Sequence, residues 1–465
     1  MNTQAQSAAA WTELLRCPYC NGQFTFAPAV TPLPLAEFGV LHCKCSRFPV
    51  IDGIPIVQRA EVGMFEHTTG ATEVAGISTA ALVALIESSK LETALLECLA
   101  VPASLPRWFE RILPMRITHH RLVRHFLRAL GKRRLRNEVL ARRQDIDACE
   151  LLDHFYRPGS SLNRAVGQYF VLRFGQPRHL AALALVAGLP AADKPVLDIA
   201  CGTGHLEHYL TQRSTPTATV GIDMNYFHLW IARHWIAPAG RYVCCNANDG
   251  LPFADAQFSA TLCSDAYHYI TNRAALLQEI ERCGANGPVL LTRVGNREVM
   301  PNEGTESSGA EYLRELHASD VRTFTESELL KAYLKRESAL AAAPTNRETL
   351  NETKWLSFGW NLPRVAEPPW SDSEWPHAVG SVGINPIYVA RLTEQGALKL
   401  RFEFPLVWYA YENHEMLRYH PRSATLRPEQ IGNYAAWQGD PSLRALVESF
   451  VLIGLPQRFR RDAQT

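Results

Sequence analysis

The stretch Pro195-Val-Leu-Asp-Ile-Ala-Cys-Gly-Thr-Gly-His205 decides the fold that we predict for this chain. Its apolar residues indicate a short buried strand, and a helical pattern follows over residues 206–210. Gly202 and Gly204 allow a tight turn and let the main chain approach a ligand closely. Because the first N–H groups of a helix have no intrahelical acceptor, this strand, turn and helix predict a nucleotide-type pocket.

Two residues distinguish this loop from a dinucleotide fingerprint, which requires Gly-x-Gly-x-x-Gly. Glu207 stands where the third glycine would be, and the strand carries an acid, Asp198. The motif Asp-x-Ala-Cys-Gly-Thr-Gly resembles the first motif of class I S-adenosylmethionine-dependent methyltransferases. The resemblance implies an α/β fold, a Rossmann-like seven-stranded methyltransferase sheet, and S-adenosyl-L-methionine as cofactor. An ordinary strand, turn and helix is the alternative.

The segments after the loop extend the resemblance. A second strand ends at Asp223, 19 positions after Gly204, which suits a carboxylate that binds ribose hydroxyls. Next, Asn246 aligns with the acid that meets the adenine amino group, and Asp249 is the alternative. A helix before the first strand would cover the cofactor and reach its carboxylate. The predicted cofactor-binding residues are Asp198, Ala200, Gly202, Gly204, Asp223, Asn246, Ala247, Ser264, Tyr169 and Arg173.

The predicted fourth strand, residues 258–264, runs into Asp265-Ala-Tyr-His-Tyr-Ile270, and in the resemblance this strand end faces the acceptor. Methyl transfer depends mainly on alignment of the reactants. For a hydroxyl acceptor a base is useful, and the pKa range of His268 suits that task. Asp265 and Tyr267 are further catalytic candidates. A purely structural histidine is the alternative for His268.

The order of the segments predicts four domains. Residues 1–60 form a zinc-ribbon-like domain, 61–164 a helical connector, 165–335 the methyltransferase core, and 336–465 a C-terminal extension. Alternating strands and helices in the core indicate a parallel sheet with helices on both faces. Residues 385–391 and 397–404 are interpreted as its closing antiparallel strands, after an irregular insertion at 340–380. Aromatic residues in the extension suit either a core or an acceptor pocket.

Four cysteines near the N-terminus have metal-ligand spacing: Cys17, Cys20, Cys43 and Cys45. Four thiolates favour tetrahedral, structural Zn²⁺. With Leu-Arg-Cys-Pro-Tyr-Cys and Arg47-Phe-Pro-Val-Ile-Asp-Gly-Ile-Pro-Ile-Val57, the segment resembles zinc ribbons of the tRNA-methyltransferase-activator type. The tight Cys-x-Cys pair departs from that pattern. Four cysteines without a metal are the alternative.

Residues 107–143 carry twelve basic residues against only Glu110 and Glu138. Leu122, Phe126 and Leu130 form an apolar stripe, so the segment predicts a basic amphipathic helix. Such a helix can lie on an anionic membrane surface or on nucleic acid. A solvated helix packed on its own domain is the alternative.

The composition of the chain limits its possible partners and its compartment. The net charge is +1, so no global bias towards nucleic acid or membranes exists. No apolar run approaches the roughly 20 residues of a membrane span, and the N-terminus lacks the pattern of a secretory signal. Seven of the 11 cysteines scatter outside the N-terminal group. These features predict a cytoplasmic protein.

Three functions fit the sequence. The first is methyl transfer to a small-molecule, sugar or lipid-linked acceptor, which the balanced charge favours. The second is methylation of a ribosomal-RNA base, because a zinc ribbon before a class I core also resembles guanine methyltransferases of ribosomal RNA. The third is a non-catalytic platform for a protein partner.

Overall fold

The computed structural model describes residues 9–29, 38–63, 76–101, 121–157, 161–190, 192–299, 305–317, 320–339, 347–363 and 375–460. Within these ranges, no helix combines the length and the apolar character that crossing a membrane requires.

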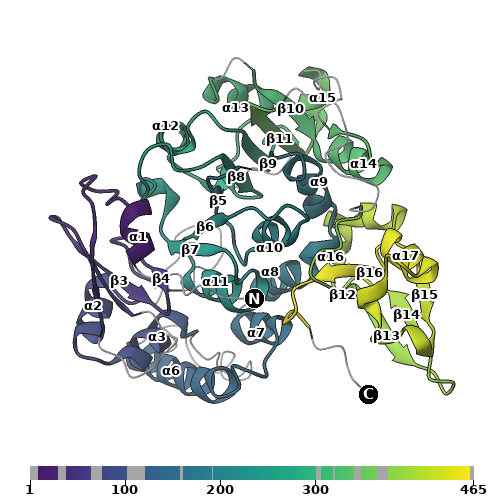
Figure 1. Ribbon diagram of the computed structural model, residues 1–465, viewed down its shortest axis with the longest axis horizontal. Coiled ribbons are helices and arrows are strands. Elements are labelled where there is room, and N and C mark those ends of the chain that lie inside the picture. Colours follow the sequence, from purple (N-terminus) through teal and green to yellow (C-terminus); the bar gives the residue numbers. More distant parts are fainter. Residues whose placement is uncertain are drawn as a thin grey trace.

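A seven-stranded mixed sheet forms the centre of the molecule (Figure 1), with the strand order β10-β11-β9-β8-β5-β6-β7. The strands from β5 to β9 are parallel to their neighbours, whereas β11 is antiparallel to both β9 and β10. Their bounds are β5 Val196–Ile199, β6 Thr219–Asp223, β7 Arg241–Cys244, β8 Ala260–Ser264, β9 Val289–Gly295, β10 Arg322–Thr325 and β11 Trp355–Trp360. The predicted α/β fold with a seven-stranded sheet is confirmed.

The central strand β5 is buried on both faces. Val196 packs in one apolar core, whereas Leu197 and Ile199 pack in the core on the opposite face. The covering helices are α8 Ser161–Leu172, α9 Pro177–Val186, α10 His205–Gln212, α11 Tyr226–Ile231, α12 Arg273–Gly284, α13 Gly309–Glu315, α14 Glu326–Lys335 and α15 Arg347–Glu352. Because β6 and β8 flank β5 on its two sides, the chain reverses its direction of winding at β5. Sheets of this kind bind ligands in the crevice outside the carboxyl end of the strand at such a point.

The N-terminal residues form helix α1 (Ala9–Leu14) and a four-stranded antiparallel sheet: β1 Thr25–Pro28, β2 Gly39–His42, β3 Arg47–Ile51 and β4 Ile54–Pro55. This unit joins the central sheet through its main chain. Val57 N–H donates to the Cys244 carbonyl (2.8 Å), and Arg16 N–H donates to the Pro252 carbonyl (2.9 Å). The N-terminal unit is therefore fixed against the β7 edge of the sheet.

The connector contains α2 (Thr79–Glu87), α3 (Leu91–Leu99), α6 (Arg121–Arg134), a π-helical segment (Leu135–Leu140) and α7 (Ala148–Tyr156). The first part of the predicted basic helix, residues 107–120, lies outside the described residues.

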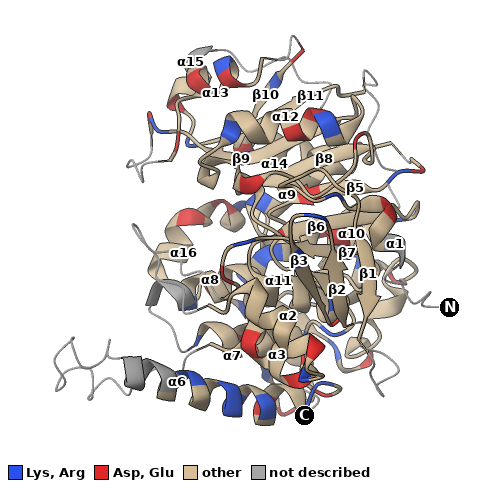
Figure 2. Cartoon of the chain, turned by 90° about the vertical axis from the view of Figure 1, so that its left-hand side faces the viewer, with Lys and Arg blue, Asp and Glu red and all other residues tan. Residues whose placement is uncertain are grey.

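Helix α6 extends along one edge of the molecule (Figure 2), and the basic side chains described on its second half are largely paired. Arg128 and Lys132 both bind Glu97 of α3, the first at 3.0 Å, and Arg136, in the π-helical segment that follows, binds Glu92 of α3 at 2.7 Å. The sequence alone suggested an unbalanced basic helix because these acids lie on a different helix. The pairing favours packing of α6 on its own domain.

The C-terminal region forms a smaller lobe beside α8 and α9 (Figure 1). It contains β12 Ser381–Ile384, β13 Tyr388–Leu392, β14 Leu398–Phe402, α16 Val407–Glu412, β15 Ser423–Leu426, α17 Pro441–Glu448 and β16 Leu452–Leu455. β13, β14 and β15 form one antiparallel sheet, and β12 pairs with β16.

The prediction of the closing strands was wrong in one respect. The two predicted segments do pair, as β13 and β14, but in the separate lobe. The strand that closes the central sheet is β11, within the segment predicted to be irregular. The physical reason is burial: four of the five β13 residues are exposed, whereas five of the six β11 residues are buried. An exposed strand cannot occupy the interior of a sheet covered on both faces.

Phe253 tests the junction between the N-terminal unit and the core. It is fully buried, packs edge-on against Phe258 at 4.9 Å, and pairs through a β-bridge with Leu15. We expect Phe253→Ala to lower the free energy of unfolding by about 3–5 kcal/mol, because the cavity cannot collapse fully. Urea denaturation measures this change. Val389→Ala, at an exposed site, is the control and should shift stability by about 0.5 kcal/mol or less. Equal effects of the two substitutions would contradict the described junction.

Candidate active site

The loop between β5 and α10 turns through left-handed backbone conformations. Ala200, Gly202 and Gly204 have φ values of 58°, 57° and 83°. A Cβ on Gly202 would lie 3.0 Å from the Phe170 ring, and one on Gly204 would lie 3.0 Å from the Ala232 Cβ. Glycine is therefore needed at both positions for conformation and for space.

Asp223, at the end of β6, holds this loop. Its carboxylate accepts hydrogen bonds from Gly202 N–H (3.0 Å) and Asn225 N–H (2.7 Å). Although burial opposes ionisation, contact with His228 and these N–H groups lowers the pKa of Asp223 below its usual value. An ionised carboxylate has about four lone-pair sites, so two remain for further donors. This arrangement fits a ligand with a hydroxyl pair.

Two buried acids lie beneath the loop. Asp198 is 3% exposed and Glu207 is fully buried. Within the described part of the chain, Asp198 Oδ1 and both Glu207 carboxyl oxygens have no hydrogen-bond partner. Burial raises the pKa of Asp198 to about 7 and that of Glu207 well above its usual range. A cation bound nearby would favour ionisation of these two acids. Glu207 is a site residue that the sequence indicated only by the absence of a third glycine.

The loop after β7 differs from the prediction in one detail. The Asn246 side-chain oxygen accepts hydrogen bonds from the N–H (3.0 Å) and the amide group (3.1 Å) of Asn248. Both of its lone pairs are engaged, so Asn246 offers its amide N–H, not its oxygen, to a ligand. Ala247 and Asp249 lie in the following 3₁₀ turn, half-buried and exposed respectively.

Asn248 was missed by the sequence analysis. Its side-chain oxygen accepts from Thr271 N–H (2.9 Å) and Asn272 N–H (3.1 Å), which lie beyond β8. It therefore ties the predicted adenine loop to the loop after the next strand of the site.

The structure brings four predicted residues together at the ends of α8 and β8. Tyr169 O–H donates to Asp265 at 3.0 Å. Arg173 contacts the Tyr169 hydroxyl, donates to Asp265 at 3.1 Å, and lies 3.4 Å from Ser264 Oγ. Helix α8 also places Phe170 against Gly202, so it lies against the glycine loop.

Asp265 is surrounded by arginines. Arg293 donates to it at 2.7 Å and Arg178 at 3.1 Å, in addition to Arg173. Burial would raise the pKa of Asp265, but these three guanidinium groups hold it well below its usual range. Such a carboxylate is a poor proton acceptor. Its contacts suit a role in holding the three arginines in place. Arg178 and Arg293 were missed because arginines within a helix and a strand carry no motif.

The other two catalytic candidates, His268 and Tyr267, have different surroundings. His268 is 2% exposed, and its Nδ1 has no hydrogen-bond partner among the described residues. Burial lowers the pKa of His268 to about 4, so its imidazole is neutral at pH 7. Tyr267 packs against Tyr312, with ring centroids 6.0 Å apart, and against Arg273. Asp265, Tyr267 and His268 therefore form no hydrogen-bonded triad.

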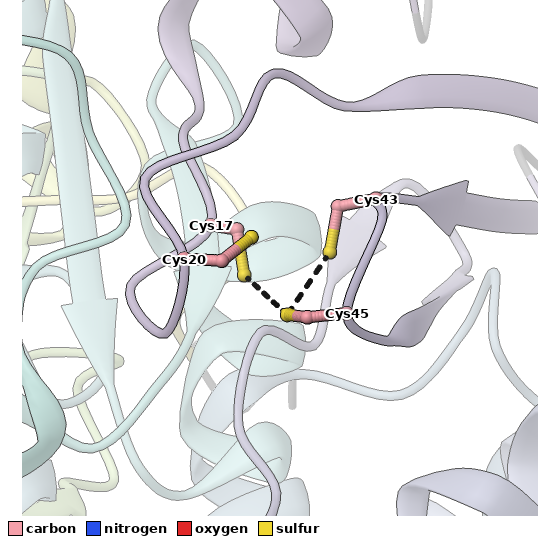
Figure 3. A group of neighbouring side chains, drawn as sticks. All are labelled: Cys17, Cys20, Cys43 and Cys45. Carbon is pink, nitrogen blue, oxygen red and sulfur yellow. Dashed lines mark hydrogen bonds between the residues drawn. The ribbon is translucent and has the colours of Figure 1, made fainter.

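The four N-terminal cysteines converge from two loops (Figure 3), and their sulfur atoms all lie within 4.8 Å of one another. Cys45 Sγ is 3.5 Å from both Cys17 Sγ and Cys43 Sγ. Four thiolates at Zn–S distances of about 2.3 Å are separated by about 3.8 Å, so the set fits a tetrahedral ion. Although burial opposes ionisation, hydrogen bonds with the other three thiols lower the pKa of Cys45 to about 6. The tight Cys-x-Cys pair is compatible with a metal site.

Comparison with known proteins gives one family match. The family described as "Methyltransferase domain" matches residues 196–287, which include the glycine loop, Asp223 and the end of β8. No curated protein matches the chain. The match confirms the prediction of an S-adenosylmethionine-dependent methyltransferase.

Several of the solved structures with some similarity are named as methyltransferases or as a complex that contains one. A TehB-like SAM-dependent methyltransferase from Corynebacterium glutamicum is 16% identical over 39% of this chain and 85% of its own, with a TM-score of 0.29. Geranyl diphosphate C-methyltransferase from Streptomyces coelicolor is 17% identical over 38% and 74%, with a TM-score of 0.30. A chain in the complex between the Haloferax volcanii Trm112 methyltransferase activator and a putative methyltransferase is 16% identical over 41% of this chain and 90% of its own, with a TM-score of 0.31. At these values the similarities indicate neither acceptor nor partner.

The cysteine cluster predicts one Zn²⁺ per chain. We expect metal analysis of the purified protein to find about one equivalent of zinc, and Cys17→Ser, which alters a buried ligand, to reduce it strongly. Cys149→Ser, a cysteine of α7 outside the cluster, is the matched control and should keep the metal. Equal zinc contents in the two variants, or no zinc in the wild type, would contradict the assignment.

Proposed function

We propose that the chain transfers the methyl group of S-adenosyl-L-methionine to a small-molecule, sugar or lipid-linked acceptor. The observation that carries this proposal is the buried group of charged residues at the ends of β8 and β9. Asp265, Arg173, Arg178 and Arg293 are each no more than 10% exposed in their side chains. A site so enclosed suits a compact acceptor better than a folded RNA. The paired charges of α6 weaken the argument for RNA further.

The cofactor residues follow from the same geometry. S-adenosyl-L-methionine supplies an electrophilic methyl group when bound. In the proposal, Asp223 accepts hydrogen bonds from the ribose hydroxyls, and the loop at Gly202 and Gly204 allows close approach of the main chain. Tyr169 and Arg173 hold the cofactor carboxylate. Ala200, Ala247 and Ser264 line the cofactor, and Asn246 donates to the adenine ring.

The acceptor side needs little acid–base chemistry. Most of the rate enhancement in an in-line displacement comes from alignment of the reacting atoms. In the proposal, Arg178, Arg293 and Asp265 orient the acceptor. His268, neutral at pH 7, has a ring nitrogen without a hydrogen-bond partner among the described residues that can accept a proton from a hydroxyl acceptor, but its lowered pKa makes it a weak base. Tyr267 supports the strand end through its packing.

Labelled cofactor tests the function and the acceptor class together. Full-length protein is incubated with methyl-labelled S-adenosylmethionine and fractionated cell extract. We expect label in the small-molecule or lipid fraction, and none with Asp223→Asn, which weakens the loop and the ribose contact. The exposed Asp255→Asn is the matched control and should retain activity. Label in RNA would contradict the acceptor class. Cofactor binding without transfer to any fraction would favour a partner platform.

A pH dependence follows from Asp198. Its pKa is raised from 3.8 to about 7, so its contribution to the stability of the free protein is complete below about pH 4 and is lost as the pH rises through 7. A cationic cofactor favours the ionised carboxylate, so binding must release this proton. We expect the Kd for S-adenosylmethionine to fall by up to about tenfold for each unit by which the pH rises towards 7, and to be constant above pH 7.

Calorimetry in buffers of different ionisation enthalpy measures that proton release. Asp198→Asn should remove both the pH slope and the buffer dependence. A wild-type affinity that is constant from pH 6 to 8 would show that Asp198 does not meet the cofactor's charge.

A further inference from the structure

A buried carboxylate from the C-terminal lobe enters the predicted acceptor side of the site. Glu412, the last residue of α16, lies 2.5 Å from Lys354 Nζ, 3.2 Å from Arg293 Nη2 and 3.9 Å from Arg178 Nη2. Its side chain is 10% exposed. The same Arg293 binds Asp265 through another nitrogen, so Glu412 shares its cations with the end of β8. No motif in the sequence pointed to this contact, which joins residues 119 positions apart.

Arg293 itself is held in an unusual conformation. It lies within β9 but has a φ of 54°, and its guanidinium carbon stacks 3.6 Å from the Trp355 ring centroid. It also binds Glu326 at 2.9 Å. A left-handed arginine in a strand costs free energy, and such residues cluster at functional sites. The conformation directs a fully buried cation towards the acceptor side of the site.

The charged groups around Glu412 include more cations than carboxylates. Four cations, Arg173, Arg178, Arg293 and Lys354, meet three carboxylates: Asp265, Glu326 and Glu412. Without Glu412, four cations would face two carboxylates. Buried charge of one sign requires a counter-charge.

Arg178 also has unused donors. Of its five N–H groups, one donates within hydrogen-bond distance to a described residue, Asp265, although the side chain is only 6% exposed. Its distance of 3.9 Å to Glu412 is an ion pair without a hydrogen bond. The guanidinium group can therefore accommodate an anion with more oxygens than a carboxylate.

Helix α16 has the character of a lid. Its inner side is held by Glu412 and by Tyr409, whose hydroxyl accepts a hydrogen bond from Gln176 at 2.8 Å. Its outer side exposes Val407 by 90%, Trp408 by 50% and Tyr411 by 73%. The helix has six residues, and Tyr409 is its one buried residue, packed against Phe404 in the core of the C-terminal lobe, so displacement of α16 must break the contacts of Tyr409 and Glu412.

We propose that Arg178, Arg293 and Lys354 form the binding site for an anionic group of the acceptor, a phosphate or a carboxylate, and that Glu412 occupies this site until the acceptor displaces it. This inference rests on the proposed methyltransferase function and specifies the acceptor class. In it, α16 moves outward when the acceptor anion replaces Glu412.

Phosphate binding to the full-length protein tests the proposal. Inorganic phosphate is titrated calorimetrically into the wild type, Glu412→Gln and Glu415→Gln. Glu415 is the matched control, because it lies three residues further on and pairs only with Arg418 among the described residues. We expect Glu412→Gln to bind phosphate at least tenfold more tightly than the other two proteins, and Arg178→Gln in the same background to abolish the gain.

Two further measurements keep the outcome decisive. If Glu412→Gln does not fold, Tyr409→Phe, which removes only the hydroxyl that Gln176 reaches, should loosen α16 and give a smaller gain. The proposal is overturned if neither Glu412→Gln nor Tyr409→Phe, when folded, binds phosphate more tightly than the wild type.

The titrations are repeated with saturating S-adenosylmethionine, which should leave the gain in phosphate affinity unchanged. Loss of the gain would assign the site to the cofactor carboxylate and overturn the proposal, whereas failure of the wild type to bind S-adenosylmethionine would instead contradict the proposed function.

Discussion

The Asp223 carboxylate holds the glycine loop by accepting hydrogen bonds from Gly202 N–H and Asn225 N–H. These bonds span the end of β6 and the loop after β5, so they fix the crevice at the point where the winding of the sheet reverses. Three residues of the loop, Ala200, Gly202 and Gly204, have left-handed conformations, which are tolerated because two of them are glycines. The geometry of the predicted cofactor site depends on this one buried, ionised side chain.

A second buried charge network links distant parts of the chain to this crevice. Asp265 and Arg293 join α8, α9 and the ends of β8 and β9, and Glu412 adds the C-terminal lobe. None of the described residues of the N-terminal unit takes part in this network. It supports the site from the opposite edge, through main-chain bonds to β7 and the loop that follows. The two appended regions therefore contact different sides of one core.

The sequence predicted what local patterns encode. The loop, the strand ending at Asp223 and the cysteine pairs were recognised because spacing alone defines them. β11 was missed because a strand buried on both faces shows no alternation, and its aromatic residues resembled an irregular segment. Arg178, Arg293 and Glu412 were missed because their roles arise from contacts between elements far apart in the chain. The excess basic charge of α6 was overestimated for the same reason, since Glu92 and Glu97 belong to another helix.

The most direct test of the account is a pair of calorimetric titrations of the full-length protein, one with S-adenosylmethionine and one with NAD. The loop held by Asp223, with Glu207 in place of a third glycine, predicts saturable binding of S-adenosylmethionine with a stoichiometry of about one per chain and no binding of NAD. Binding of NAD in place of S-adenosylmethionine, or of neither ligand, would contradict the account.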